Sequence, residues 1–313
     1  MAMKFVMRIT FLLLLAVAYG LAEGAPPMAK PNCPASCGNV SIPYPFGIGS
    51  NCFMHKTYEI VCNESGVAAA AMAFLVLPSI RVEVLEIGIT GRYNSYVGSY
   101  EPELIRVKMP IISSNCKNKS SVAGSGGVLD ISGTPFFFSS SLNNFVSVGC
   151  NNKATLAGLD SMVLGGCKTD CNNQKLRGKC TGFDCCQTTV PSSGIQRLNV
   201  TLESTTNNTT TCKHAFVAET QWLESNETDP SNDVQYLEYV PVALEWTIPN
   251  STSIINLTEA HRRNMSVGYT SYGAAFYFCF SRHEGNPYLN MACQGKLLLP
   301  TPSIFPNFFT LHA

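Results

Sequence analysis

Cys33-Pro-Ala-Ser-Cys37-Gly-Asn-Val-Ser-Ile-Pro-Tyr-Pro-Phe-Gly-Ile-Gly49 is the most informative stretch of this sequence. Two cysteines open it, and closely spaced proline, glycine and aromatic residues follow, which is typical of a stapled loop. The stretch begins a series of 14 cysteines, an even number, as complete pairing into disulfides requires.

The amino terminus has the layout of a secretory signal peptide, which we place at residues 1–24. Lys4 and Arg8 give it a positive start, an apolar run follows over residues 9–18, and small residues surround Gly24. This run is too short to span a bilayer, so a cleaved signal is favoured over the alternative, a membrane anchor. The mature chain then enters an oxidising compartment, where cysteines pair.

Ten Asn-X-Ser/Thr sequons agree with secretion and predict a glycoprotein. An acceptor asparagine must be exposed, so we expect these positions on loops or on the solvent side of strands. The sequons are Asn39, Asn63, Asn118, Asn199, Asn207, Asn208, Asn226, Asn250, Asn256 and Asn264.

Composition bounds the size and the partners of the protein. Of 313 residues, 13% are charged and 45% hydrophobic, which leaves ample material for a core, and the formal net charge is +0. The usual positive charge of nucleic-acid-binding proteins is therefore missing, and no such partner is expected. The apolar run 67–80 is too short for a membrane span and the tail 297–313 holds three prolines, so we expect no transmembrane segment. A glycolipid-anchor signal is the alternative for that tail.

Short β-branched and aromatic runs, separated by Gly, Asn, Ser and Pro clusters, predict strands over most of the chain. We expect a β-rich, disulfide-stapled secreted ectodomain of two small β domains with little helix. One short helix is predicted around residues 214–223. The predicted strands cover residues 81–87, 104–109, 134–138, 145–148, 198–202 and 240–248.

The cysteines fall into groups that suggest domain limits. Each group has an even number, so each could pair within itself, and the neighbours Cys185 and Cys186 are expected to have different partners. The groups are Cys33, Cys37, Cys52 and Cys62; Cys116 and Cys150; Cys167, Cys171, Cys180, Cys185, Cys186 and Cys212; and Cys279 with Cys293.

The opening stretch resembles the start of the galacturonan-binding extracellular module of plant wall-associated receptor kinases. Later motifs match the same ectodomain in the same order, so the resemblance covers roughly residues 31–293. These motifs are Gly149-Cys-Asn-Asn-Lys-Ala-Thr-Leu156, Gly165-Gly-Cys-Lys-Thr-Asp-Cys171, Gly182-Phe-Asp-Cys-Cys-Gln-Thr-Thr-Val-Pro191, Tyr239-Val-Pro-Val-Ala-Leu-Glu-Trp246 and His283-Glu-Gly-Asn-Pro-Tyr-Leu289.

The resemblance, together with the cysteine groups, suggests a division of the chain. We expect a cysteine-rich galacturonan-binding-like domain over residues 25–150 and a second cysteine-rich domain of wall-associated-kinase type over 151–260. A degenerate EGF-like remnant and a divergent tail follow over 261–313. Cys279 and Cys293 alone cannot build an EGF-like repeat, and kinase signatures are absent, so we expect a truncated, kinase-less member of a family whose other members are membrane-anchored.

Enzymatic motifs are weak. None of the five histidines lies in a metal-ligand spacing, and no nucleophile elbow occurs. The carboxylates Asp229, Asp233, Glu238 and Glu245 leave a glycosidase pair as an alternative, but the sequence does not set their separation. We expect no catalytic residues, no metal site and no cofactor.

The resemblance implies pectin as the ligand, a polymer whose carboxylates require Lys or Arg. Between Cys167 and Cys180 the cations outnumber the single carboxylate Asp170, which predicts a local anion site. A solvated loop is the alternative. The predicted ligand residues here are Lys168, Lys175, Arg177 and Lys179, with Lys153 upstream.

Tyr44 and Phe46 flank Pro45 and form a second candidate, since a ring in a restricted turn can be presented to a sugar. The alternative is that both rings fill a small core.

Two functions follow. The first is non-catalytic binding of cell-wall pectin, or homogalacturonan, by a secreted protein of the cell wall. The second is a protein-interaction or decoy module that regulates related receptor ectodomains. Calcium could bridge pectin to the protein, although the sequence shows no dedicated calcium loop.

Overall fold

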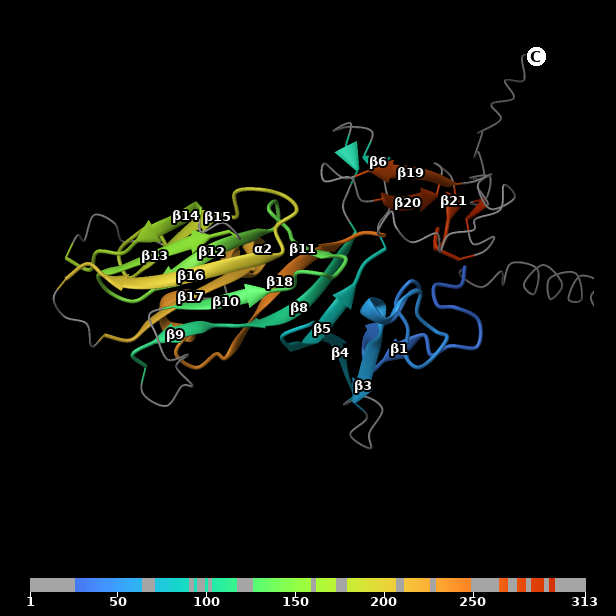
Figure 1. Ribbon diagram of the computed structural model, residues 1–313, viewed down its shortest axis with the longest axis horizontal. Coiled ribbons are helices and arrows are strands. Elements are labelled where there is room, and N and C mark those ends of the chain that lie inside the picture. Colours follow the sequence, from blue (N-terminus) through green and yellow to red (C-terminus); the bar gives the residue numbers. More distant parts are fainter. Residues whose placement is uncertain are drawn as a thin grey trace, which may run out of the picture.

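A computed structural model describes residues 26–63, 71–89, 93–94, 99–100, 103–116, 126–158, 162–172, 179–206, 211–225, 229–248, 265–269, 275–279, 283–289 and 293–295. Within them the chain is β-rich, as predicted, and elongated (Figure 1). The predicted signal peptide and the tail after residue 295 lie outside these residues. No helix in the described ranges is both long enough and apolar enough to cross a bilayer.

A six-stranded antiparallel sheet forms the middle of the molecule. In its strand β8 the residues alternate between the two sides, with Ile105, Val107 and Met109 buried and Arg106 and Lys108 on the other face, as a period of two requires. The strand order is β11 (Phe136–Phe138), β18 (Tyr239–Trp246), β8 (Leu104–Pro110), β5 (Arg81–Ile87), β4 (Met72–Val76) and β3 (Ile60–Asn63).

Two four-stranded antiparallel sheets form the other end of the molecule (Figure 1). Strand β17 is buried at every position, so it has cover on both faces. The first sheet is β10 (Gly126–Asp130), β16 (Arg197–Ser204), β13 (Asn152–Ala157) and β14 (Val163–Lys168). The second is β15 (Cys185–Thr189), β12 (Asn143–Val148), β17 (Lys213–Glu219) and β9 (Ile112–Ser114).

The remaining elements are short. They are β1 (Ser36–Cys37), β2 (Val40–Ser41), the 3-10 helix η1 (Lys56–Tyr58), β6 (Tyr93–Asn94), β7 (Ser99–Tyr100), α2 (Thr220–Glu224), α3 (Pro230–Asp233), β19 (Met265–Tyr269), β20 (Ala275–Cys279), β21 (His283–Glu284) and β22 (Gln294–Gly295).

Each of the six predicted strands overlaps an observed one, but the helix predicted around residues 214–223 is mostly wrong. Residues 213–219 form β17, and only the turn from Thr220 onward is helical. Burial on both sides of β17 removes the polar alternation by which a strand is usually recognised, and the resulting apolar run looks equally helical in sequence.

Seven disulfides use all 14 cysteines. The first and last groups pair internally, and Cys185 and Cys186 have different partners, as predicted. Pairing within the middle groups is wrong, because Cys116 and Cys150 each bond to a later cysteine. The bonds are Cys33–Cys52, Cys37–Cys62, Cys116–Cys212, Cys150–Cys171, Cys167–Cys186, Cys180–Cys185 and Cys279–Cys293.

An aromatic cluster joins the opening stretch to the middle sheet. Phe46 packs edge-on against Tyr58 and Trp246, with ring centroids 5.4 and 5.2 Å apart, and lies 6.1 Å from Phe136. Tyr288, from the late Gly-Asn-Pro-Tyr motif, packs on Trp246 at 5.3 Å. The first and last recognised motifs therefore share one core.

Buried polar bonds fix the same junction. The Asn286 amide donates to the carbonyls of Met28 (2.7 Å) and Tyr44 (2.6 Å), and the Tyr288 hydroxyl donates to Glu103 (2.5 Å). Asn286, which lies 258 and 242 residues away in sequence from Met28 and Tyr44, thus holds the opening loop in place.

Candidate functional site

Lys30 and Tyr44 form a cation–aromatic pair on the opening loop. The Lys30 ammonium lies 6.0 Å from the centre of the Tyr44 ring and donates to the carbonyl of Asn51 at 2.6 Å. The Tyr44 backbone N–H is bonded to Met28, so both ends of this pair are anchored. Burial raises the pKa of Tyr44, so its hydroxyl stays protonated at neutral pH.

Phe53 and Lys56 form a second pair. The Lys56 ammonium lies 5.8 Å from the Phe53 ring centre and also pairs with Glu59. The Lys56 side chain is 74% exposed, so the attraction of Glu59 is screened by water and leaves the cation accessible. His55 holds the turn, since its Nδ1 accepts from the Thr57 N–H at 3.3 Å.

These two pairs lie on adjoining loops. Met54 N–H donates to the Pro45 carbonyl at 2.9 Å, and Lys30 reaches across to Asn51. We call Lys30, Tyr44, Phe53 and Lys56 the cation–aromatic surface. Both rings are half-buried against the core, which fixes them, while the cations stay in contact with water.

The cation–aromatic surface has the chemistry that an acidic sugar requires. A ring face can pack on the apolar face of a pyranose, and an ammonium beside it can pair with a carboxylate. Sequence reasoning found Tyr44 but missed Lys30, Phe53 and Lys56. The close spacing of Phe53 and Lys56 was a usable signal, whereas the pairing of Lys30 with Tyr44 depends on the fold.

A third pair lies on the middle sheet. The Arg81 guanidinium stacks over Phe74, 4.1 Å from the ring centre. It belongs to the outward face of β4 and β5, separate from the loops above.

The structure places three cations of the predicted basic loop. Lys153 on β13 and Lys168 on β14 stand directly opposite each other and are exposed, and Lys153 forms a 3.5 Å ion pair with Glu203. The exposed Lys179 donates to the Ser225 carbonyl at 2.6 Å. Lys175 and Arg177 lie outside the described residues, so the proposed ligand role of this loop stays a prediction.

Phe46 is in a different position from Tyr44. Its side chain is only 1% exposed within the aromatic cluster, so it has no free face for a sugar. Phe46 therefore fills the core, which was the alternative to sugar binding for this residue. Tyr44 keeps a partly exposed ring.

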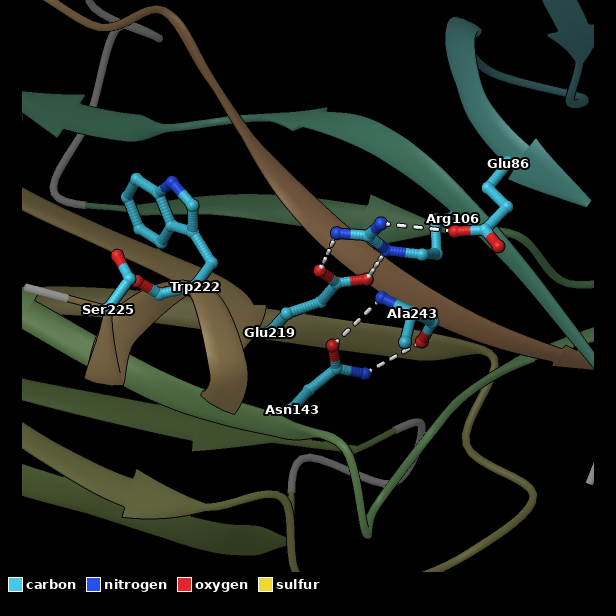
Figure 2. Close-up of polar contacts among 7 residues, drawn as sticks. All are labelled: Glu86, Arg106, Asn143, Glu219, Trp222, Ser225 and Ala243. Atoms are coloured by element: carbon cyan, nitrogen blue, oxygen red, sulfur yellow. Dashed lines mark hydrogen bonds and ion pairs between the residues drawn. The ribbon is translucent and has the colours of Figure 1, made fainter. Parts of the chain in front are cut away.

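Two carboxylates hold the Arg106 guanidinium (Figure 2). Its Nε and Nη2 each donate to Glu219 at 2.6 Å, and Nη1 donates to Glu86 at 3.2 Å. The hydrogen bonds with Glu219 raise the pKa of Arg106 above its ordinary value. Because both acids already occupy its donors, Arg106 ties β8 to β17 instead of offering an anion site.

Cys116, Cys212 and His214 bring three possible metal-ligand atoms together. The two sulfurs are bonded to each other, so neither can act as a thiolate ligand. His214 Nδ1 is also within 2.8 Å of Ser113 Oγ. With this disulfide formed, the cluster is a disulfide beside a hydrogen-bonded histidine and is not a metal site.

Three sequon asparagines are among the described residues. Asn39 and Asn63 are exposed, as an acceptor requires, and Asn199 is half-buried with its amide donating to the Gly158 carbonyl at 3.1 Å. The other seven lie outside the described residues: Asn118, Asn207, Asn208, Asn226, Asn250, Asn256 and Asn264.

Comparison with protein families finds two matches in chain order. Residues 33–94 match the family "wall-associated receptor kinase galacturonan-binding", and residues 177–254 match "wall-associated kinase". The first match contains Tyr44, Phe53 and Lys56 of the cation–aromatic surface, and Lys30 lies three residues before it.

Several curated relatives come from Arabidopsis thaliana. Putative wall-associated receptor kinase-like 13 is 29% identical over 84% of this chain and 41% of its own length. Wall-associated receptor kinase-like 10 is 28% identical over 84% and 39%, and wall-associated receptor kinase-like 4 is 30% identical over 83% and 36%. The chain thus spans about two fifths of the length of these relatives. No solved structure matches it.

The order of the two family matches confirms the resemblance of the cysteine-framed motifs. The chain carries one segment of the wall-associated receptor kinase galacturonan-binding family and one of the wall-associated kinase family, and it is similar to wall-associated receptor kinase-like proteins over about 84% of its length.

Proposed function

We propose that this protein binds acidic cell-wall polysaccharide, pectin in its de-esterified homogalacturonan form, without cleaving it. The main support is that the cation–aromatic pairs lie in the same part of the chain as the family match. The segment that matches the galacturonan-binding family holds, with Lys30 just before it, two anchored aromatic rings that each have an ammonium group within about 6 Å, the usual limit for such pairs.

The binding site is the cation–aromatic surface. Successive galacturonate units would place one carboxylate near Lys30 and another near Lys56, while Tyr44 and Phe53 pack against ring faces. Two exposed charge contacts of roughly 0.5–1 kcal/mol each give modest affinity per unit, so a long polymer with repeated contacts is held better than a short one.

The predicted basic loop is a second contact region in this proposal. Lys153 and Lys168 form an exposed cationic pair on neighbouring strands, and Lys179 lies just before Cys180. A polyanion could follow both regions. Glu203 offsets Lys153 much as Glu59 offsets Lys56, so we assign the larger share of binding to the cation–aromatic surface because of its two rings, not because of its charge.

Secretion to the cell wall, glycosylation and the absence of catalysis belong to the same proposal. Seven disulfides support an oxidising compartment. We propose no resident cofactor. Calcium enters as a bridge between pectin carboxylates and acidic residues of the protein.

The test uses the secreted full chain on an array of plant polysaccharides. We expect retention on de-esterified homogalacturonan, weak retention on fully methyl-esterified pectin, and a loss of binding as salt rises, because ions screen attraction to a polyanion. Reducing ends should not accumulate during incubation. Equal binding to both pectins, or binding that salt does not change, would contradict the proposal. Salt-insensitive capture of a related ectodomain instead would favour the interaction or decoy function.

A further inference from the structure

The outward face of strand β4 carries an exposed apolar stripe. Met72 and Val76 are 43% and 51% exposed, and the half-buried Phe74 lies between them. In a strand with one face on the core, these outward positions are normally polar. Here all three are apolar, and Arg81 alone stacks over the stripe, at Phe74, in the contacts that the structure describes.

Asn63 stands at the edge of this stripe. It is the last residue of β3, it is exposed, and it pairs directly with Met72 across the two strands. Val61 pairs with Phe74, whereas Ile60 and Leu75 are buried, so Asn63, Met72, Val61 and Phe74 share the outward face. Asn63 also begins the sequon Asn63-Glu-Ser65.

We infer that Asn63 carries an N-linked glycan whose first sugars lie over Met72 and Phe74. Directly opposed side chains have Cβ atoms roughly 5 Å apart and diagonal ones roughly 7–8 Å apart, so a sugar on Asn63 reaches both residues. The C–H faces of a pyranose suit an apolar stripe, and its hydroxyls face water. The glycan is therefore a cover for the stripe as well as a surface modification.

The position of β3 gives this cover a second effect. β3 is the terminal strand of the six-stranded sheet, and exposed apolar residues beside a terminal strand favour association between chains. A bulky hydrophilic group at Asn63 opposes that association. The inference itself does not depend on the proposed function.

The experiment compares Asn63→Gln with Asn39→Gln in the full chain secreted from a eukaryotic host. Both asparagines are exposed and begin sequons, but Asn39 lies in the turn between β1 and β2, which the Cys37–Cys62 disulfide ties to the face of β3 opposite to Asn63. Ser65→Ala, which removes the sequon and keeps Asn63, repeats the test without changing the asparagine. Peptide mass spectrometry measures occupancy, thermal unfolding measures Tm, and a hydrophobic dye reports the exposed stripe.

We expect Asn63 to be occupied, and its loss to lower Tm by roughly 2–4 °C and to increase dye binding, with smaller changes for Asn39→Gln. Trimming the glycan to one sugar should preserve the Tm. In a Met72→Ser background the Tm effect of the glycan should fall by at least half, because part of the contact is gone.

Three results would overturn the inference. They are an unmodified Asn63 in the secreted protein, equal Tm changes for the Asn63 and Asn39 variants, and a glycan effect that Met72→Ser leaves unchanged.

Discussion

Replacing Tyr288 by Phe should destabilise the protein, because one hydroxyl makes two hydrogen bonds in the core. It donates to Glu103 Oε2 at 2.5 Å and accepts from the Tyr277 N–H at 3.1 Å. Glu103 is 1% exposed, and its other oxygen has no partner among the described residues. Without the hydroxyl, the carboxyl group stays buried and loses the hydrogen bond that Tyr288 donates to it.

At about 1–1.5 kcal/mol for each buried hydrogen bond, Tyr288→Phe should lower the free energy of unfolding by roughly 2–3 kcal/mol. That corresponds to a fall in Tm of roughly 4–12 °C for a chain of this size. Urea unfolding followed by tryptophan fluorescence suits the test, since Trp246 packs against Tyr288. Tyr236→Phe, at a residue 81% exposed, is the control and should change stability by less than about 0.5 kcal/mol. Equal effects of the two variants would refute the role of the late motif in the core.

The same carboxyl group predicts a pH dependence. Burial raises the pKa of Glu103 well above its ordinary value, and the hydrogen bond from Tyr288 offsets only part of that rise. The folded protein therefore keeps a proton that the unfolded chain releases. Its stabilising contribution is full below the ordinary carboxyl pKa of about 4.3 and declines as pH rises through the folded value. The wild type should lose stability relative to Glu103→Gln as pH increases, and parallel stability curves for the two proteins would argue against a protonated Glu103.

Two further substitutions test contacts between the sheets (Figure 2). Asn143→Ala removes three buried hydrogen bonds, two of them with Ala243, and should lower the free energy of unfolding in urea by roughly 2–4 kcal/mol. Asn144→Ala is the control and should be nearly neutral, because the side-chain contact of Asn144 is exposed. Arg106→Lys keeps the charge but loses the paired bonds to Glu219; a decrease of roughly 1–2 kcal/mol is expected by the same measurement, and no decrease would show that this ion pair is not stabilising.

Much of the architecture was predictable from local patterns. The β8 and β5 strands alternate polar and apolar residues, and this period of two is visible in the sequence. Strand β17 was not predictable in this way, because sheets cover both of its faces. The pairing of Cys116 with Cys212 and of Cys150 with Cys171 depends on which strands become neighbours, and no spacing rule encodes that.

The candidate site was predictable only in part. Tyr44 stands out in its motif, but the approach of Lys30 requires Asn286 and the Asn51 carbonyl to position two loops. Phe46 looks like Tyr44 in sequence, yet the turn sends its ring into the cluster with Trp246. A run of exposed cations such as Lys153 and Lys168 is visible in sequence, whereas the opposing charge of Glu203 emerges only from strand register.

We propose that the cation–aromatic surface binds homogalacturonan. Calorimetric titration with a defined oligogalacturonate tests it, comparing the wild type with Lys30→Gln/Lys56→Gln and, as a charge-matched control, Lys153→Gln/Lys168→Gln. Two lost contacts of roughly 0.5–1 kcal/mol each should raise the Kd about 5- to 30-fold for the first pair and clearly less for the second. Unchanged affinity in Lys30→Gln/Lys56→Gln, with loss confined to Lys153→Gln/Lys168→Gln, would contradict the claim and move the site to the basic loop.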